Sequence, residues 1–176
     1  MEGGAQLLDE VAIREFLATS YPRLVAAVAL IEGNRSTAED AVQESLARAW
    51  ERSERGLEIE NLDAWVTRVA MNISKSRLRR IRAEARATSR AGSPANTGNP
   101  SVAAIDLERA LADLPRRQRQ ATVLRYYLDL DVAEVAAALG VHEGTTKTTL
   151  FRARRALATA LGEHDIEEAN DDARLG

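Results

Sequence analysis

The chain has 176 residues, of which 45% are hydrophobic and 29% charged, a balance typical of one globular domain or two small ones. It has no cysteine, which excludes disulfides, thiolate zinc sites and cysteine nucleophiles, and its two histidines are too few for a histidine-rich metal site. The formal net charge of −3 hides an uneven distribution: residues 1–63 hold 13 acids and 6 bases, residues 64–90 hold 1 acid and 8 bases, and residues 162–176 hold 6 acids and 1 base. The basic segment therefore indicates local affinity for nucleic acid, because binding depends on where the cations lie.

One segment divides the chain into two blocks. Residues 88–101 read TSRAGSPANTGNPS, a composition typical of a flexible linker. Neither block contains alternating β-branched runs, so we expect an all-α fold of two small helical domains. The predicted segments are a disordered N-terminus at 1–9, a first domain at 10–86, a linker at 87–103, a second domain at 104–161 and an acidic tail at 162–176. With no signal peptide and no apolar run near the ~20 residues of a membrane span, we expect a cytoplasmic protein without membrane insertion.

The first block begins with two short predicted helices. One starts around Val11 and Phe16, and Pro22 fits the first turn of the next. Ser36 and Glu39 then have the spacing of a capping box, which predicts the start of a third helix.

The third predicted helix, residues 38–50, has an apolar side that includes Trp50 and an acidic outer face. The outer face carries Asp40, Gln43 and Glu44, with Glu39 at its margin. Acids near a helix N-terminus are stabilised by the helix dipole, and this alone explains Glu39 and Asp40 as solvent-facing residues. Such a face also suits a basic protein partner, whose approach it would steer.

The fourth predicted helix starts near Asn61 or Asp63, either of which can cap it, and runs to about Arg86. Trp65 at the helix start could stack on a base, but it falls beside the apolar positions of the helix, so we favour a core tryptophan. Spacings of 4, 3, 4, 3 and 4 place six polar residues on one face: Arg68, Asn72, Lys75, Arg79, Arg82 and Arg86. A solvated arginine-rich face is one interpretation. The other is a track for a nucleic-acid backbone, in which Asn72, a donor and acceptor, reads a base.

The second block contains a helix-turn-helix pattern. We expect helices at 104–113 and from Pro115, in a first turn, to about Leu128. Asp131 then caps a helix that ends at Gly140, and a basic helix follows from about Gly144 to Leu161. The exposed face of this last helix carries hydroxyl and cationic side chains suited to major-groove edges and phosphates: Thr145, Lys147, Thr148, Phe151, Arg152 and Arg155. An ordinary helical hairpin with a charged face is the alternative.

These features, in this order, resemble the extracytoplasmic-function (ECF) sigma factors of bacterial RNA polymerase. The resemblance rests on the run AEDAVQE at 38–44, the run ARAW at 47–50, the run RVAMN at 68–72, the helix-turn-helix around LGV at 139–141, and the run RAR at 152–154. It covers residues 17–161 and lacks a central third region, as in this minimal class. Thr146, Thr148 and Thr149 depart from the family's usual Val and Ser-Arg, and Met71 replaces a common Arg.

The resemblance implies that residues 10–86 are sigma region 2 and residues 104–161 are sigma region 4. Region 2 would bind the clamp helices of the largest subunit of core RNA polymerase through Glu39, Asp40, Gln43 and Glu44. It would hold the melted −10 element of promoter DNA through Arg68, Asn72, Lys75, Arg79 and Arg82. The loop 54–61 would help form the base pocket. Region 4 would lie at the flap region and read the −35 element through Thr145, Lys147, Thr148, Arg152 and Arg155. Family members are commonly held by an anti-sigma factor. The resemblance implies no cofactor, no metal and no enzymatic activity.

Three other classes compete with this interpretation. An ordinary helix-turn-helix regulator that binds duplex DNA by itself explains the second block but leaves the acidic helix and the linker without a purpose. An enzyme is disfavoured because the sequence shows no nucleophile, metal cluster or phosphate-binding loop. A protein-interaction scaffold is the third alternative. The acidic tail has two interpretations, a regulatory element or a solvated extension.

Overall fold

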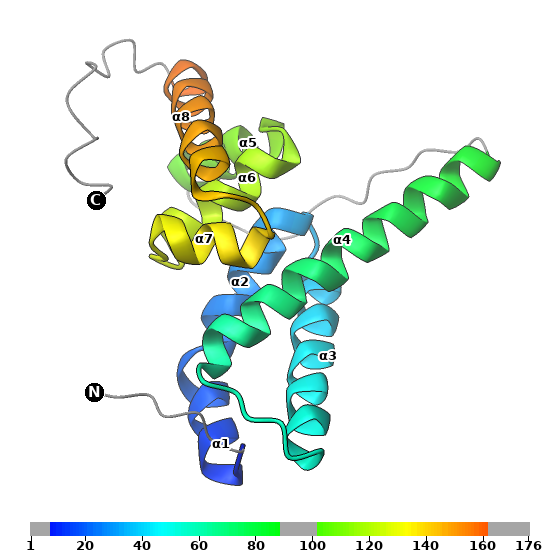
Figure 1. Cartoon of the computed structure of the whole chain (residues 1–176). Coiled ribbons are helices and arrows are strands. Elements are labelled where there is room, and N and C mark those ends of the chain that lie inside the picture. Colours follow the sequence, from blue (N-terminus) through cyan, green and yellow to red (C-terminus); the bar gives the residue numbers. More distant parts are fainter. Residues whose placement is uncertain (1–7, 89–101, 162–176) are drawn as a thin grey trace. The chain divides into compact units, whose positions relative to one another are not determined.

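The computed structural model describes residues 8–88 and 102–161, except for the side chains of residues 78, 81, 82, 84–88 and 102–106. The secondary structure of this part is helical (Figure 1), which confirms the predicted all-α class. The predicted linker, apart from its ends, and the acidic tail at 162–176 lie outside the described residues, as does most of the predicted N-terminal segment 1–9. The chain divides into two compact units, Met1–Asn96 and Thr97–Gly176.

The first unit consists of four helices: α1 (Glu10–Thr19), α2 (Tyr21–Glu32), α3 (Arg35–Glu54) and α4 (Leu62–Thr88). Helix α3 packs against both α2 and α4. Small buried residues, including Ala41, Ser45 and Ala70, let the helix backbones approach closely, and Val28 and Ile31 of α2 add bulk to the core. This packing fixes α3 and α4 as one rigid platform for their outer faces.

The helix boundaries of the first unit follow local signals. Pro22 lies in the first turn of α2, and Gly33 ends that helix with a φ of 72°, a left-handed conformation that favours glycine. Asn61 caps α4, since its Oδ1 accepts a hydrogen bond of 2.9 Å from the Ala64 amide. Of the two predicted cap residues, Asn61 and Asp63, the structure therefore selects Asn61.

The predicted capping box of Ser36 and Glu39 is wrong. Asn34 caps α3 instead, and its Oδ1 accepts a hydrogen bond of 2.9 Å from the Thr37 amide. The left-handed turn at Gly33 makes Asn34 the first residue with extended backbone, so the helix has already begun when the chain reaches Ser36. Glu39 is then available to form an ion pair with Arg35 at 2.9 Å.

Both tryptophans are less buried than the sequence predicts. Trp50 is 39% exposed, because it lies at the edge of the α3 face whose centre is formed by Val42, Ala49 and Ser53. Trp65 is half-buried near the start of α4, so the expected core tryptophan is confirmed only in part.

The second unit consists of α5 (Val102–Asp113), α6 (Arg116–Thr122), the π-helical turn η1 (Val123–Tyr127), α7 (Val132–Leu139) and α8 (Glu143–Ala160). Leu111, Leu114 and Ala153 form a core cluster against which Leu157 packs. The predicted cap at Asp131 is confirmed as a full capping box with Glu134.

The turn between α7 and α8 has the predicted geometry. Gly140 ends α7 with a φ of 65°, and the Val141 amide donates a hydrogen bond of 3.0 Å to the Ala136 carbonyl. Val135, Ala136 and Leu139 are buried beneath this turn, so the crossing of α7 and α8 is fixed by apolar contact.

The helix expected from Pro115 to Leu128 differs in two details. Pro115 is the residue that precedes α6 rather than part of its first turn. The helix then widens into η1, where the Leu128 amide donates to the Val123 carbonyl at 3.1 Å. This widening keeps Val123 buried and leaves Tyr126 54% exposed.

Candidate nucleic-acid and protein interfaces

The acidic face of α3 is present on the surface of the first unit. The side chains of Asp40 and Glu44 are 60% and 40% exposed, and Gln43 is exposed between them. Gln43 is held in place by its amide nitrogen, which donates a hydrogen bond of 3.2 Å to the hydroxyl of Tyr21 on α2. Glu39 lies at the margin of the same face in its pair with Arg35. The four residues predicted to form a protein-binding face therefore lie on one exposed side of α3.

An arginine that the sequence analysis missed lies beside this face. Arg77 of α4 places Nη1 3.6 Å from Oδ2 of Asp40 and Nη2 3.7 Å from Oε2 of Glu44. The same guanidinium donates a hydrogen bond of 3.3 Å to the Thr37 carbonyl. The spacing signal that could have found Arg77 is its position four residues after Ile73 on the apolar face of α4.

The basic face of α4 is exposed along its described length. Arg68, Asn72, Lys75 and Arg79 are exposed, and the opposite side of the helix buries Val66, Ala70 and Ile73. Arg79 also donates a hydrogen bond of 3.3 Å to the hydroxyl of Ser76. Arg82 and Arg86 also belong to α4, but the structure does not describe their side chains. We call the four exposed residues together with Arg82 the basic stripe.

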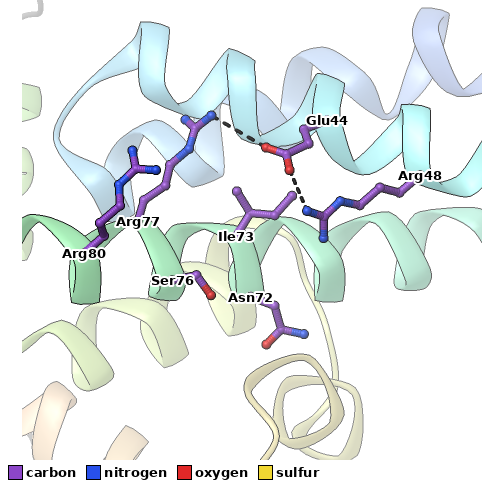
Figure 2. A pocket seen from close by; sticks show the side chains of 7 residues that line it. All are labelled: Glu44, Arg48, Asn72, Ile73, Ser76, Arg77 and Arg80. Carbon is purple, nitrogen blue, oxygen red and sulfur yellow. Dashed lines mark hydrogen bonds and ion pairs between the residues drawn. The ribbon is translucent and has the colours of Figure 1, made fainter.

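A polar groove of about 410 Å³ lies between α3 and α4. Its lining residues are Glu44, Arg48, Asn72, Ile73, Ser76, Arg77 and Arg80. Figure 2 shows Glu44 between Arg77 and Arg48, with Ile73 beneath the ion pairs. The Glu44–Arg48 pair is the shorter of the two, at 2.6 Å. The groove thus brings Glu44 of the acidic face and Asn72 of the basic stripe to one place, which the spacing of residues within each helix does not predict.

The loop 54–61 turns sharply between α3 and α4. Gly56 has a φ of 74°, and the Leu57 amide donates to the Arg52 carbonyl at 3.2 Å. Ile59 is buried and anchors the loop, whereas Leu57 is 47% exposed. The loop is therefore held against the helices at one point and presents its first half to solvent.

The exposed face of α8 has the composition predicted for it. Thr146, Leu150 and Ala153 are buried on one side, and the opposite side exposes Thr145, Lys147, Thr148, Arg152 and Arg155. The Thr148 hydroxyl donates to the Gly144 carbonyl at 2.9 Å, so its lone pairs remain available as acceptors. Phe151 is 52% exposed, and the guanidinium carbon of Arg155 lies 5.9 Å from its ring centre. This face therefore offers cations, hydroxyl acceptors and one apolar ring.

His142 occupies the N-cap position of α8, but its side chain makes no capping hydrogen bond to the helix. Among the described residues, no three His, Cys, Asp or Glu side chains are grouped in a way that could hold a metal ion. Within the same residues, no helix has the length and apolar character needed to cross a membrane.

Comparison with known proteins explains this arrangement. Residues 17–84 match the family model for sigma-70 region 2, and residues 104–157 match that for sigma-70 region 4. The ECF RNA polymerase sigma factor SigL of Mycobacterium tuberculosis is 36% identical over 140 residues, which cover 76% of this chain and 79% of SigL. The chain belongs to the ECF sigma factors. The ECF sigma factor SigF of Caulobacter vibrioides is 32% identical over 160 residues, covering 89% of each chain.

A solved structure of a sigma factor also matches the fold of this chain. The sigma factor RpoE of Bartonella quintana, in complex with the anti-sigma factor NepR, matches with a TM-score of 0.72 and 27% identity. The match covers 89% of this chain and all of that one. As an ECF sigma factor the chain is a promoter-specific initiation factor rather than an independent helix-turn-helix regulator, since a regulator accounts only for the second unit. The sigma factors are not an enzyme family.

Proposed function

We propose that this ECF sigma factor divides its work among three surfaces: the acidic face of α3 binds core RNA polymerase, the basic stripe of α4 holds the melted −10 element, and α8 reads the −35 element. The observation that carries the proposal is the separation of charge within the first unit. Carboxylates face outward on α3, and cations face outward on α4 from a helix packed against it.

Core polymerase binds through Glu39, Asp40, Gln43 and Glu44. An acidic surface cannot bind phosphate, but it fits a helical partner that presents arginine or lysine. The family assigns this role to the clamp helices of the largest subunit. Gln43, tied to Tyr21, supplies polar contacts beside the two carboxylates.

The melted −10 strand lies along the basic stripe. Opening a base pair loses stacking of about 1.4 kcal/mol per step, and the protein compensates by neutralising the strand and holding an unpaired base. Arg68, Lys75, Arg79 and Arg82 bind the backbone. Asn72, the amide within the row, hydrogen-bonds the base, and the loop 54–61 closes the pocket.

The −35 element binds in duplex form to α8. Arg152 and Arg155 reach base edges or phosphates, Lys147 binds a phosphate, and Thr145 and Thr148 accept hydrogen bonds from bases. The second unit also contacts the flap region of the polymerase. The two units then gain affinity for one promoter because the polymerase fixes their spacing.

An anti-sigma factor regulates the chain by covering one or more of these surfaces. The support is the likeness to RpoE, which was solved in complex with the anti-sigma factor NepR. The protein works in the cytoplasm, where its polymerase and promoters are, and it binds these partners without a cofactor, a metal or a catalytic reaction of its own.

Two measurements with purified core polymerase test the proposal: the affinity of the chain for core, and run-off transcription by the resulting holoenzyme. The double variant Asp40→Lys, Glu44→Lys should bind core about 100-fold more weakly, because facing like charges cost several kcal/mol. The matched control is Glu10→Lys, which reverses an exposed carboxylate on α1 and should leave core binding unchanged. The milder pair Asp40→Asn, Glu44→Gln should lie between them and guards against misfolding. Unchanged core binding by both double variants would contradict the assignment, and tight, sequence-specific binding of duplex by the free chain would favour the regulator.

A further inference from the structure

A row of exposed side chains runs along α8 toward its C-terminal end. Lys147, Phe151, Arg155 and Thr159 follow one another at spacings of four and all are exposed, so they lie on one side of the helix. Phe151 is 52% exposed, and the guanidinium carbon of Arg155 lies 5.9 Å from its ring centre. These four residues, the α8 row, therefore present an apolar ring between two cations. The proposed function gives a role to both cations and none to the ring.

The acidic tail that follows α8 has the opposite pattern. Residues 162–176 hold six acids and one base, and Ile166 is preceded by Glu163 and Asp165 and followed by Glu167 and Glu168. These acids do not stabilise the helix that they follow, because carboxylates at a helix C-terminus oppose the helix dipole. The acidic tail thus has an apolar side chain between two pairs of carboxylates, which complements the α8 row.

The acidic tail is long enough to return along the α8 row. Leu161 caps α8, and the next residue is Gly162, a residue type that commonly lets a chain turn back at a helix end. At a rise of about 1.5 Å per residue, Phe151 lies about 15 Å along the helix axis from Leu161. Five residues of extended chain span up to about 18 Å, which brings Ile166 to Phe151.

The same alignment matches the charges. Arg155 lies one turn nearer the C-terminal end of α8 than Phe151, just as the first pair of carboxylates precedes Ile166. Lys147 lies one turn further from that end, just as the second pair follows Ile166. Exposed ion pairs are individually weak. A segment joined to its target by a few residues, however, has an effective concentration on the order of 1 mM, so several weak contacts together hold it in place.

We propose that the acidic tail docks on the α8 row of its own chain, with Ile166 against Phe151. Its carboxylates lie beside Lys147 and Arg155, in the place of the phosphates of DNA. The consequence for promoter binding rests on the proposed function of α8: the free chain binds the −35 duplex weakly, because the DNA must displace the acidic tail.

Paramagnetic relaxation measures the docking on the free full-length chain. The sequence has no cysteine, so Asn170→Cys provides a single site for a nitroxide spin label. The amide signals of α8 are compared with the label oxidised and reduced in an isotope-labelled chain. The matched control carries the same label and a carboxamide in place of each acid of the tail: Glu163→Gln, Asp165→Asn, Glu167→Gln, Glu168→Gln, Asp171→Asn and Asp172→Asn.

The docked tail places the label near the N-terminal half of α8, so the amide signals of residues 145–149 should broaden. The carboxamide control should show no such broadening. Raising the salt concentration from about 50 mM to about 500 mM should largely remove it, because the charges are then screened. Ile166→Ser, which leaves the charge unchanged, should reduce the broadening at low salt.

Binding of the −35 duplex by the free chain tests the consequence. The full-length carboxamide variant should bind this duplex about five- to tenfold more tightly than the wild-type chain at low salt. A synthetic peptide of residues 162–176 should reverse that gain, and the same peptide with Ile166→Ser should do so more weakly. The two peptides have equal charge, so a difference between them reports the apolar contact rather than ionic strength.

Three results would overturn the docking. Broadening confined to the last turn of α8 would mean that the tail is solvated, and equal broadening in the carboxamide control would mean that charge does not hold it. Broadening in a mixture of spin-labelled chains and isotope-labelled chains without the spin label would assign the face to the tail of a second copy. Failure of the proposed function has a different signature: the broadening would remain, but neither chain would prefer the −35 duplex to other sequences.

Discussion

The two helices of this sigma factor that we propose to bind DNA, α4 and α8, differ in how their exposed faces are supported. Helix α8 is fixed by the turn at Gly140 and by buried Leu150 and Ala153 within its own small unit. Helix α4 is fixed by apolar residues along half its length and then by an arginine bound to carboxylates of α3. In the proposed function, the face that reads duplex DNA is therefore supported by packing within its own unit, whereas the helix proposed to hold the melted strand also contacts the acidic face of α3 through Arg77.

The largest expected effect comes from breaking the support of α8. Leu150 is 4% exposed, so Leu150→Ala should lower the free energy of unfolding of the second unit by about 2–5 kcal/mol through lost burial and a cavity. Hydrogen exchange resolved by unit measures it. Leu107→Ala, at a site 45% exposed, is the control and should change stability by no more than about 0.5 kcal/mol. Equal loss of protection in the first unit would show that the two supports are not independent.

Asn72→Ala should weaken binding of the melted strand by about 1–3 kcal/mol, because the proposed function makes this amide the base-reading group of the stripe. The measurement is holoenzyme affinity for a fluorescent single strand carrying the −10 sequence. Binding of the −35 duplex serves as the internal control and should not change. A variant that weakens both to the same extent would argue against separate reading of the two elements.

Arg152→Ala tests the role proposed for α8. It should lower the binding free energy for the −35 element by about 1–3 kcal/mol and relax the preference at one base pair. Lys147→Ala should instead weaken binding of all sequences alike and reduce the salt slope by about 1. Duplex titrations of the holoenzyme at several salt concentrations distinguish the two. If both variants lose affinity without any change of base preference, α8 contacts only phosphate.

The last prediction concerns the capping box of α7 in the helix-turn-helix, where we expect a small change in stability. Asp131→Ala removes the capping box of α7 and should lower the stability of the second unit by about 1 kcal/mol. Thermal unfolding followed by circular dichroism measures the shift. Glu134→Ala, which removes the other half of the box, should give a smaller shift in the same direction. No shift in either variant would mean that packing beneath Gly140 is sufficient to form the turn.

Most of the helices and the exposed faces could be predicted from the sequence, because their signals are local. Pro22, Asn61, Asp131 and Gly140 act on the backbone within one turn, and the spacings of 3 and 4 determine which residues share a helix face. The basic stripe and the face of α8 follow from that periodicity alone.

Other features could not be predicted from the sequence, because they depend on how the helices pack against one another. Tertiary packing made Asn34 the cap of α3, left Trp50 half in solvent, and widened the helix at η1, where packing requires Val123 to stay buried. It also joined Arg77 to Asp40 and Glu44, a contact between residues more than thirty positions apart. No periodicity specifies such a pair, because it forms only after the apolar sides of α3 and α4 have brought the two helices together.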